Sequence, residues 1–392
     1  MKIMAVNAGS SSLKFQLLEM PSENVISSGL VERIGMEEGV FTLKFSGNKK
    51  VVNCEIKDHK KAVLLVVDAL IKNSIIKSLD EIKGVGHRIV QGGEIFENNC
   101  LVNDKVIEDI LSLSDLAPLH NPAHVVGIKA FQHILENVPA VVVFDTTFHR
   151  TMDELSYMYA TPYEWYEKYG IRKYGAHGTS HQYVSQRVNA LLGRKDTKVI
   201  VCHLGNGASI CAVKNGISID TSMGLTPLEG IPMGTRSGNI DPTVLQVIHK
   251  KENKSIDELM NILNKKSGFL GVSGVSSDSR DIEESMLSGN KRSKLAFDLQ
   301  IKRICDYIGS YYILMGGVDA IAFTAGIGEN SSDVRKAVVD RLFVLGTKLD
   351  EAKNALRGEN EISTKDSKVK IFVIPTNEEV MIAREVVRLA KL

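Results

Sequence analysis

The chain has 392 residues, of which 43% are hydrophobic and 24% charged, and a formal net charge of +1 at pH 7. This length exceeds one typical hydrophobic core and predicts two domains. The near-neutral balance, without any basic run, makes nucleic acid and acidic membranes poor candidate partners. Five scattered cysteines without a C-x-x-C pair predict reduced thiols in a cytoplasmic protein, and no disulfide framework or structural zinc. The sequence contains no pattern typical of a signal peptide or a membrane span.

The first part of the chain predicts an α/β fold with crossover helices. Strands are expected at residues 2–6, 13–18, 40–45, 51–56, 85–90 and 138–144, and helices at 59–76 and 121–135. Asn121-Pro122 predicts an N-cap followed by proline at the first helical position. The apolar run 138–144 is typical of a strand buried on both faces.

The second part repeats this pattern. Strands are expected at residues 198–202, 210–213, 217–220, 320–324 and 369–374, and a long helix at 294–315. Further helices are expected after Asp241-Pro242, from about Ser331, and after the caps Thr179-x-x-Gln182 and Thr376-x-x-Glu379. Each part contains a strand, a turn of small residues and a second strand, which favours a duplicated fold that binds a nucleotide between its halves.

Three turns rich in glycine or serine have the composition of phosphate-binding loops. Residues 7–15 combine Asn7, three serines and Lys14, whose N–H groups, hydroxyls and charge suit a polyphosphate. Gly205-Asn206-Gly207 and Gly326-Ile327-Gly328 each follow a strand, and the second also precedes a helix. Each turn alone has a plain structural alternative, such as a Ser-rich hairpin for the first. The three together favour a nucleotide, although no P-loop, Rossmann, protein-kinase or α/β-hydrolase motif occurs.

Two arginines and one carboxylate stand at element ends, where functional side chains concentrate. Arg88 and Arg236 could bind a carboxylate in a fork or neutralise a transferring phosphoryl group, although most surface arginines have no specific role. Asp145 follows the strand 138–144, at the end of a parallel strand where sites lie. It could orient a nucleophile or a magnesium-bound water, and its structural alternative is loop capping.

In each of two residue pairs, His177 with His181 and Glu378 with Glu379, one member is expected to have a structural role and the other a chemical role. His181 is expected within the first turn of a helix and to be structural, which leaves His177 as the candidate for contacting a phosphoryl oxygen. H-x-x-x-H lacks the glutamate of a zincin, so a metal-binding pair is not expected. Glu379 fits the expected capping box, which leaves Glu378 as the candidate magnesium ligand through water.

With these residues identified, the chain resembles the acetate and propionate kinase family of the sugar kinase/Hsp70/actin superfamily. The resemblance extends from Asn7 to the last helix and is carried by specific motifs. These lie at residues 7–15, 86–93, 118–122, 144–146, 177–181, 203–207, 220–224, 234–236, 277–280, 324–330 and 375–379.

The resemblance implies a duplicated two-domain α/β fold with the active site in the interdomain cleft. It implies an N-terminal domain of residues 1–150, joined by the C-terminal helix 377–392, with the first phosphate turn and the acyl-substrate residues. The second domain, residues 151–376, would bind the nucleotide and form a homodimer. The implied reaction is ATP + acetate ⇌ ADP + acetyl phosphate, by direct in-line transfer with Mg²⁺, for which Mn²⁺ is an alternative.

Site residues are also implied, residue by residue. The catalytic residues would be Asp145, His177 and Arg236, and the metal would be placed by Asn7 and Glu378. Acetate would be held by Arg88 in a pocket lined by Val90, Leu119, Ala176 and Pro227. The nucleotide would contact Ser10, Ser12, Lys14, His203, Leu204, Gly205, Asn206, Gly207, Asp278, Ser279, Arg280, Gly326, Ile327, Gly328, Glu329 and Asn330.

The sequence departs from the family pattern at Ala176, where a phenylalanine of the methyl pocket would stand. Losing that ring predicts a larger pocket and better use of propionate or butyrate, although one methylene changes binding by only about 1–3 kcal/mol. Asn239 and Ser279 also differ from frequent family residues, without removing an assigned group. The alternatives are a propionate or butyrate kinase, a pyrophosphate-dependent variant, and a non-catalytic nucleotide sensor.

Overall fold

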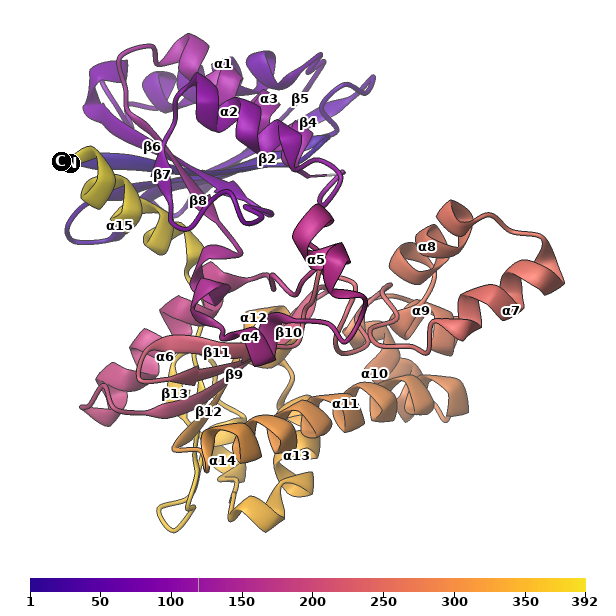
Figure 1. Ribbon diagram of the computed structural model, residues 1–392. Helices are drawn as coiled ribbons and strands as arrows, with labels where there is room; N and C mark the ends of the chain where they lie inside the picture. The colour runs from indigo at the N-terminus through magenta and orange to yellow at the C-terminus, as the bar shows by residue number, and fades with distance from the viewer. Residues whose placement is uncertain (119) are drawn as a thin grey trace. The chain divides into compact units, whose positions relative to one another are not determined.

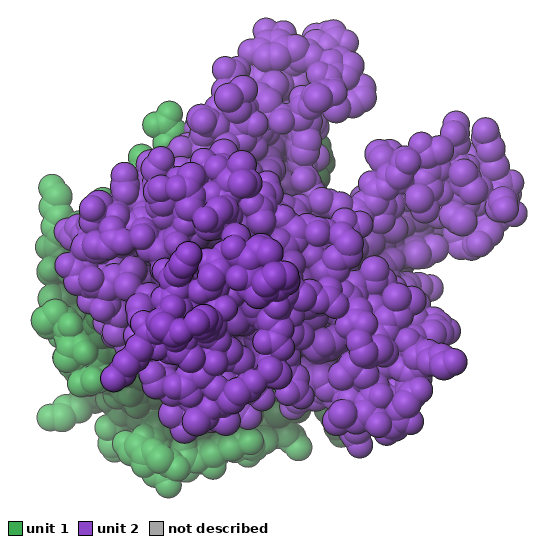
Figure 2. All heavy atoms as spheres, turned by 90° about the horizontal axis from the view of Figure 1, so that it is seen from below, with its two compact units in different colours: residues 1–147, 377–392 green, residues 148–376 purple. Residues whose placement is uncertain are grey.

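The computed structural model describes residues 1–118 and 120–392, which form two compact units. Unit 1 comprises residues 1–147 and 377–392, and unit 2 comprises residues 148–376 (Figure 2). The last helix of the chain therefore belongs to the same unit as the first strand. The domain division expected from the sequence placed the first boundary three residues later, at 150.

Unit 1 is built on an eight-stranded sheet in the order β5-β4-β3-β2-β1-β6-β8-β7. Strands β1, β6 and β8 are mutually parallel, and the others pair antiparallel with their neighbours. The strands are β1 (Lys2–Ala8), β2 (Ser12–Glu19), β3 (Asn24–Glu32), β4 (Gly39–Phe45), β5 (Asn48–Cys54), β6 (Ile82–Ile89), β7 (Cys100–Leu101) and β8 (Ala140–Phe144).

Helices pack on both faces of this sheet, and β6 shows why. Gly84 and Gly86 face the last helix, since β-carbons placed on them would lie 2.4 Å from Val386 and 2.2 Å from Ile382. His87 points to the opposite face, where its ring meets the edge of Phe131. The helices are α1 (His59–Lys72), α2 (Asp104–Ser112), α3 (Asn121–Ile134) and α15 (Glu378–Ala390), with the short η1 (Leu79–Glu81) (Figure 1).

Unit 2 has a six-stranded sheet in the order β11-β10-β9-β12-β14-β13. Here β9, β12 and β14 are parallel and the remaining pairs antiparallel. The order and directions match β3-β2-β1-β6-β8-β7 of unit 1, so the predicted duplicated fold is confirmed. The strands are β9 (Lys198–Leu204), β10 (Ala208–Lys214), β11 (Ile217–Thr221), β12 (Ala320–Thr324), β13 (Asn360–Glu361) and β14 (Lys370–Val373).

The sheet of unit 2 is also covered on both faces. In β9, Val199 and Val201 pack in the cluster that includes Val184 of α6, whereas Ile200 and Cys202 pack in the cluster that includes Ile308 of α11. Helices α7 and α8 form a hairpin that extends away from this sheet (Figure 1). The helices are α4 (Glu154–Tyr157), α5 (Tyr163–Tyr169), α6 (Gly178–Leu192), α7 (Thr243–Glu252), α8 (Ile256–Lys265), α9 (Gly268–Ser273), α10 (Ser279–Leu287), α11 (Lys291–Met315), α12 (Ala325–Asn330), α13 (Ser332–Arg341) and α14 (Glu351–Asn354), with η2 (Thr147–Thr151) at the unit boundary and η3 (Phe343–Leu345).

Three predicted helix caps are wrong. Asn121 lies inside α3, where its buried amide donates to the Gln91 and Ile110 carbonyls, and His120 takes the cap position. The cap of α6 is His177, two residues before the expected Thr179, and it has a left-handed conformation (φ 55°). The cap of α15 is Asn377, whose side chain accepts from Val380 N.

Residues 325–330, expected to form a turn, instead form the short helix α12. Glu329 makes this possible because its carboxylate accepts from the backbone N–H of Ala325 at 2.8 Å. Among the helices of the described residues, none combines the length and apolar character needed to cross a bilayer.

Candidate active site

A buried ion pair lies at the ends of two neighbouring strands of unit 1. Arg88 of β6 donates through Nε to Asp145 Oδ1 at 2.8 Å and through Nη2 to Oδ2 at 2.7 Å. The Asp145 side chain is 2% exposed and that of Arg88 20%. This pair uses one edge of the guanidinium, and within residues 1–118 and 120–392 the Nη1 nitrogen has no hydrogen-bond partner. The edge formed by Nη1 and Nη2 is thus open to a second carboxylate.

Two glutamates at the start of α15 extend this charge cluster. Glu378 Oε2 lies 3.8 Å from Arg88 Nε, and Glu379 Oε1 accepts from Lys14 Nζ at 2.6 Å. Burial, followed by repulsion from Asp145 and Glu379, raises the pKa of Glu378 above its ordinary value although Arg88 opposes the shift. Asn7 pairs with Lys14 in the β1–β2 ladder, so its backbone lies at the same end of the sheet. Three carboxylates face two cations here, which leaves an excess negative charge suited to a divalent cation.

A cluster of histidines and hydroxyls surrounds the start of α6 in unit 2. The His177 ring stacks on His203 with centroids 4.1 Å apart. Ser209 Oγ lies 2.9 Å from His177 Nδ1 and 2.7 Å from His181 Nε2, while Ser180 Oγ lies 2.8 Å from His203 Nδ1. These contacts fix the His177 ring at its Nδ1 side. His181 is fully buried and holds Ser209, which agrees with the structural role expected for it.

Arg236 is a partly buried arginine beside the turn that joins β9 to β10. A β-carbon placed on Gly207 would lie 3.3 Å from Arg236 Nη1 and 3.6 Å from His177 Nε2, so both side chains border this glycine. Arg236 Nη1 makes only long contacts, 3.3 Å to the Pro227 carbonyl and 3.7 Å to Met233 Sδ. In the part of the chain that the structure describes, no carboxylate pairs with it. Burial accordingly lowers the pKa of Arg236.

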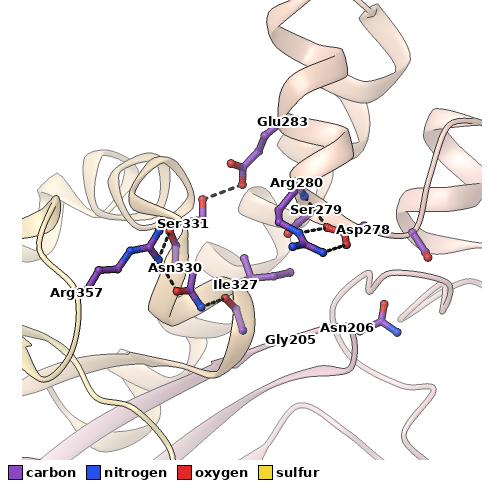
Figure 3. A pocket seen from close by; sticks show the side chains of 12 residues that line it. Gly205, Asn206, Asp278, Ser279, Arg280, Glu283, Ile327, Asn330, Ser331 and Arg357 are labelled. Carbon is purple, nitrogen blue, oxygen red and sulfur yellow. Dashed lines mark hydrogen bonds and ion pairs between the residues drawn. The ribbon is translucent and has the colours of Figure 1, made fainter. Parts of the chain in front are cut away.

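A cavity of about 720 Å³ opens in unit 2 (Figure 3). Its walls come from the β9–β10 turn, the start of α10, the helix α12 and the segment before β13. The lining residues are Gly205, Asn206, Ser277, Asp278, Ser279, Arg280, Glu283, Gly326, Ile327, Asn330, Ser331 and Arg357. Small-molecule sites in proteins have about this volume.

Eight of the sixteen residues expected to contact a nucleotide line this cavity, and the other eight do not. Gly328 and Glu329 are outside its lining, and Glu329 is engaged by Ala325 N and Thr376 N. Asp278 caps α10 and forms a forked ion pair with Arg280. The remaining expected residues of unit 2, His203, Leu204 and Gly207, lie beside the cavity in β9 and its turn, whereas Ser10, Ser12 and Lys14 belong to unit 1.

Sequence reasoning missed four lining residues: Ser277, Glu283, Ser331 and Arg357. Glu283 accepts from Ser331 Oγ at 2.8 Å, and Arg357 Nη1 donates to both oxygens of Asn330. Helical periodicity could have found Glu283, because it lies four residues after Ser279 on the same face of α10. Nothing in the local sequence marks Arg357, which reaches the cavity from a distant loop.

The residues expected to line an acyl pocket are divided between the units. Val90 follows β6 in unit 1, while Ala176 and Pro227 belong to unit 2 and Leu119 lies outside the described residues. Ala176 is 2% exposed, and its carbonyl accepts from His149 Nε2 at 2.9 Å. The conformation of this segment is therefore closely held.

Buried neutral histidines give the protein a predicted acid sensitivity. Burial lowers the pKa of His87 to about 3 and that of His124 to about 4, although the Ala8 carbonyl opposes the second shift. In the unfolded chain both titrate near 6.5, so below that pH the unfolded state binds more protons. Lowering the pH from 7 to 5 is therefore expected to reduce the free energy of unfolding by about 2 kcal/mol for each histidine.

Urea unfolding of His87→Asn at pH 7 and pH 5 checks this expectation. Whatever the substitution costs at pH 7, the further loss at pH 5 should be smaller than that of the wild type by about 2 kcal/mol. The exposed His133→Asn serves as the control. Equal losses in His87→Asn and the wild type would contradict the assignment.

The sequence and the structure are similar to those of known proteins. Residues 2–384 match the model of the Acetokinase family. The chain is 60% identical over 390 residues to an acetate kinase of Acholeplasma laidlawii, with 99% of each chain covered. Its structure is similar to the crystal structure of Porphyromonas gingivalis acetate kinase (TM-score 0.95, 44% identity, 99% of each chain covered). It is also similar to that of a propionate kinase from Francisella tularensis (TM-score 0.94, 43% identity, 99% of each chain covered).

Proposed function

The chain belongs to the acetokinase family and is a kinase, and from this premise we propose that it transfers the γ-phosphoryl group of ATP to acetate. The carboxylate oxygen of acetate forms a bond to phosphorus while the bond from phosphorus to the bridging oxygen of ADP breaks. The products are acetyl phosphate and ADP, and the reaction is reversible. No proton has to be removed from the nucleophile, because a carboxylate is already an anion at neutral pH.

The observation that carries the proposal is the cavity of unit 2. It joins the β9–β10 turn and helix α12 to the Asp278–Arg280 segment, and its volume of about 720 Å³ accommodates a nucleoside with phosphates. Gly205 and Asn206 line it, and the same turn continues to Gly207, which Arg236 and His177 border. An enzyme that used pyrophosphate would have no need of this adenosine-sized space, so the cavity favours ATP.

In unit 1, Arg88 would bind the acetate carboxylate and Asp145 would orient it. Asp145 already occupies the Nε–Nη2 edge of the guanidinium, which leaves the Nη1–Nη2 edge to receive acetate. Burial opposes the charge of Arg88, but Asp145 and Glu378 outweigh it and raise the pKa of the arginine. A permanently charged and fixed arginine would place the nucleophilic oxygen with little loss of entropy.

In unit 2, Arg236 and His177 would stabilise the equatorial oxygens of the transferring phosphoryl group. Both border the same glycine, where a backbone without a side chain allows close approach. Because the chemistry requires positioning and charge neutralisation, an arginine without its own carboxylate is suited to meet the developing charge.

The expected metal is Mg²⁺, with Asn7 and Glu378 as the residues that would place it. No group of three acidic, histidine or cysteine side chains fit to hold a metal is found in residues 1–118 and 120–392. An amide and one carboxylate nevertheless fit Mg²⁺, which keeps most of its waters and binds partly through nucleotide phosphates. When bound, Mg²⁺ would neutralise charge on the phosphates. We further propose a cytoplasmic homodimer that meets through unit 2, and Mn²⁺ as a substitute metal.

Steady-state kinetics with hydroxylamine trapping of the acyl phosphate test the proposal. Acetate, propionate and butyrate are each paired with Mg-ATP and with Mg-pyrophosphate, in the wild type and in Ala176→Phe. Turnover of acetate with ATP is expected, together with propionate use at a comparable kcat/KM because Ala176 lacks a bulky side chain. Adding the ring should lower kcat/KM for propionate relative to acetate by about tenfold, and the Tm of the variant controls for folding.

The outcomes separate the remaining candidates. Propionate use far below that of acetate, and unchanged in Ala176→Phe, would contradict the role of residue 176. Turnover only with pyrophosphate would overturn the nucleotide assignment. Binding of ATP without turnover of any acid would favour the nucleotide sensor.

A further inference from the structure

Two buried histidines contact consecutive carbonyls of the loop that joins β1 to β2 in unit 1. His124 of α3 lies with Nδ1 2.7 Å from the Ala8 carbonyl, and His59 of α1 lies with Nε2 2.7 Å from the Gly9 carbonyl. The rings are 3% and 6% exposed. A carbonyl only accepts hydrogen bonds, so each contacting nitrogen carries the proton.

The same loop is held from other directions. Gly9 N donates to Ser12 O at 2.8 Å, and Ile34 N donates to Ser11 O at 3.0 Å. Four of the five carbonyls from Ala8 to Ser12 thus accept a hydrogen bond. In addition, Ala8 packs on α3 so closely that a β-carbon on Gly127 would lie 2.5 Å from the Ala8 methyl group.

This arrangement determines which groups the loop presents. In a planar trans peptide the C=O and N–H point in opposite directions. Because His59 holds the Gly9 carbonyl, the N–H of Ser10 is directed away from α1, and Ser10 is exposed. Carbonyl oxygens repel phosphate, whereas N–H groups attract it. Because the histidines hold the carbonyls on one side of the loop, the opposite side presents N–H groups and favours an anion.

We propose that His59 and His124 are positioning residues that orient the Ala8–Ser12 loop for the phosphates of the nucleotide. Each donates one imidazole N–H to the loop. The inference rests on the proposed function, because it takes the nucleotide phosphates as the ligand of this loop. Neither histidine contacts the reacting atoms.

His124 contacts the loop through Nδ1, whereas His59 contacts it through Nε2. The same substitutions should therefore have opposite effects at positions 124 and 59. The amide nitrogen of asparagine can replace Nδ1 of histidine, and that of glutamine can replace Nε2. At position 124, asparagine should therefore keep kcat/KM for ATP within about threefold, while glutamine and alanine should lower it by about 10- to 100-fold. At position 59, glutamine should preserve activity and asparagine and alanine should not. His133→Asn, an exposed change on α3, is the control.

The ATP-induced rise in Tm of each variant provides a readout independent of turnover, and the same reversed pattern is expected there. A pattern identical at both positions, or alanine variants that match the wild type, would overturn the proposal, since packing alone does not distinguish the nitrogens. If the wild type binds ATP without turnover, the proposed function fails while the Tm pattern still decides the inference. If the wild type neither turns over nor binds ATP, both are overturned.

Discussion

Replacing Arg236 with methionine is expected to lower kcat by about 10³-fold while leaving Tm unchanged or higher. Arg236 is partly buried, lacks a carboxylate partner within residues 1–118 and 120–392, and makes contacts of only 3.3 and 3.7 Å. Burial already disfavours its charge. The folded protein therefore gains little from this charge, whereas the proposed transition state gains much. Methionine keeps the apolar stem and removes the charge, and kcat with Mg-ATP and acetate, together with Tm, measures the two effects.

Arg335→Met is the control, because this arginine is fully buried and, unlike Arg236, well bonded. It donates to Asn354 Oδ1 at 2.8 Å, to the Asn354 carbonyl at 2.5 Å and to the Gly328 carbonyl at 2.9 Å. Removing it leaves three buried acceptors unsatisfied and should cost roughly 2–5 kcal/mol of stability. A large loss of Tm in Arg236→Met, or a kcat within tenfold of the wild type, would show that Arg236 is structural.

Arg88→Met is expected to lose both stability and activity. Asp145 would remain buried without its guanidinium, and breaking a buried ion pair in this way costs about 3–5 kcal/mol. The variant should also bind the acetate carboxylate less tightly and position it less well. We therefore expect a higher KM for acetate and a lower kcat. Urea unfolding and acetate kinetics measure the two losses.

The double variant Arg88→Met/Asp145→Asn separates the two losses. With the second charge removed, most of the lost stability should return because no uncompensated carboxylate stays buried. Activity should not return, since both proposed roles are gone. The stability loss of the double variant could instead equal the sum of the losses in Arg88→Met and Asp145→Asn. That result would show that the ion pair contributes nothing beyond each side chain alone.

The central strands could be predicted because their residues are apolar on both faces. The duplication could be predicted because these strands and the turns between them recur in the same order. Strands β9 and β12 are buried almost throughout, and apolar runs of this kind can be recognised as strands without knowing which strands lie beside them. Strand β3 was missed because its buried face carries Ser27 and Gly29 in place of large apolar residues. The Phe15 ring of β2 fills this space, since a β-carbon on Gly29 would lie 2.4 Å from it. The pattern of β3 depends on a partner strand that local sequence does not reveal.

The candidate site divides in the same way. The glycine turn after β9 and the position of Asp145 at the end of β8 carry local signals, and they could be predicted. The caps of α3 and α15 were not, because tertiary contacts engage Asn121 and Thr376 elsewhere: Thr376 Oγ1 lies 2.7 Å from Ser180 Oγ. Helix α12 likewise depends on the carboxylate of Glu329.

The packing of α15 against Gly84 and Gly86 has a consequence for synthesis of the chain. The glycine face of β6 leaves the ribosome early, yet the helix that covers it is translated only after all of unit 2. Until α15 has been synthesised, unit 1 exposes one apolar face of its sheet and is open to association with other nascent chains. Unit 2 is continuous in sequence and carries no such delay. The second half of the duplication can therefore finish folding before the first.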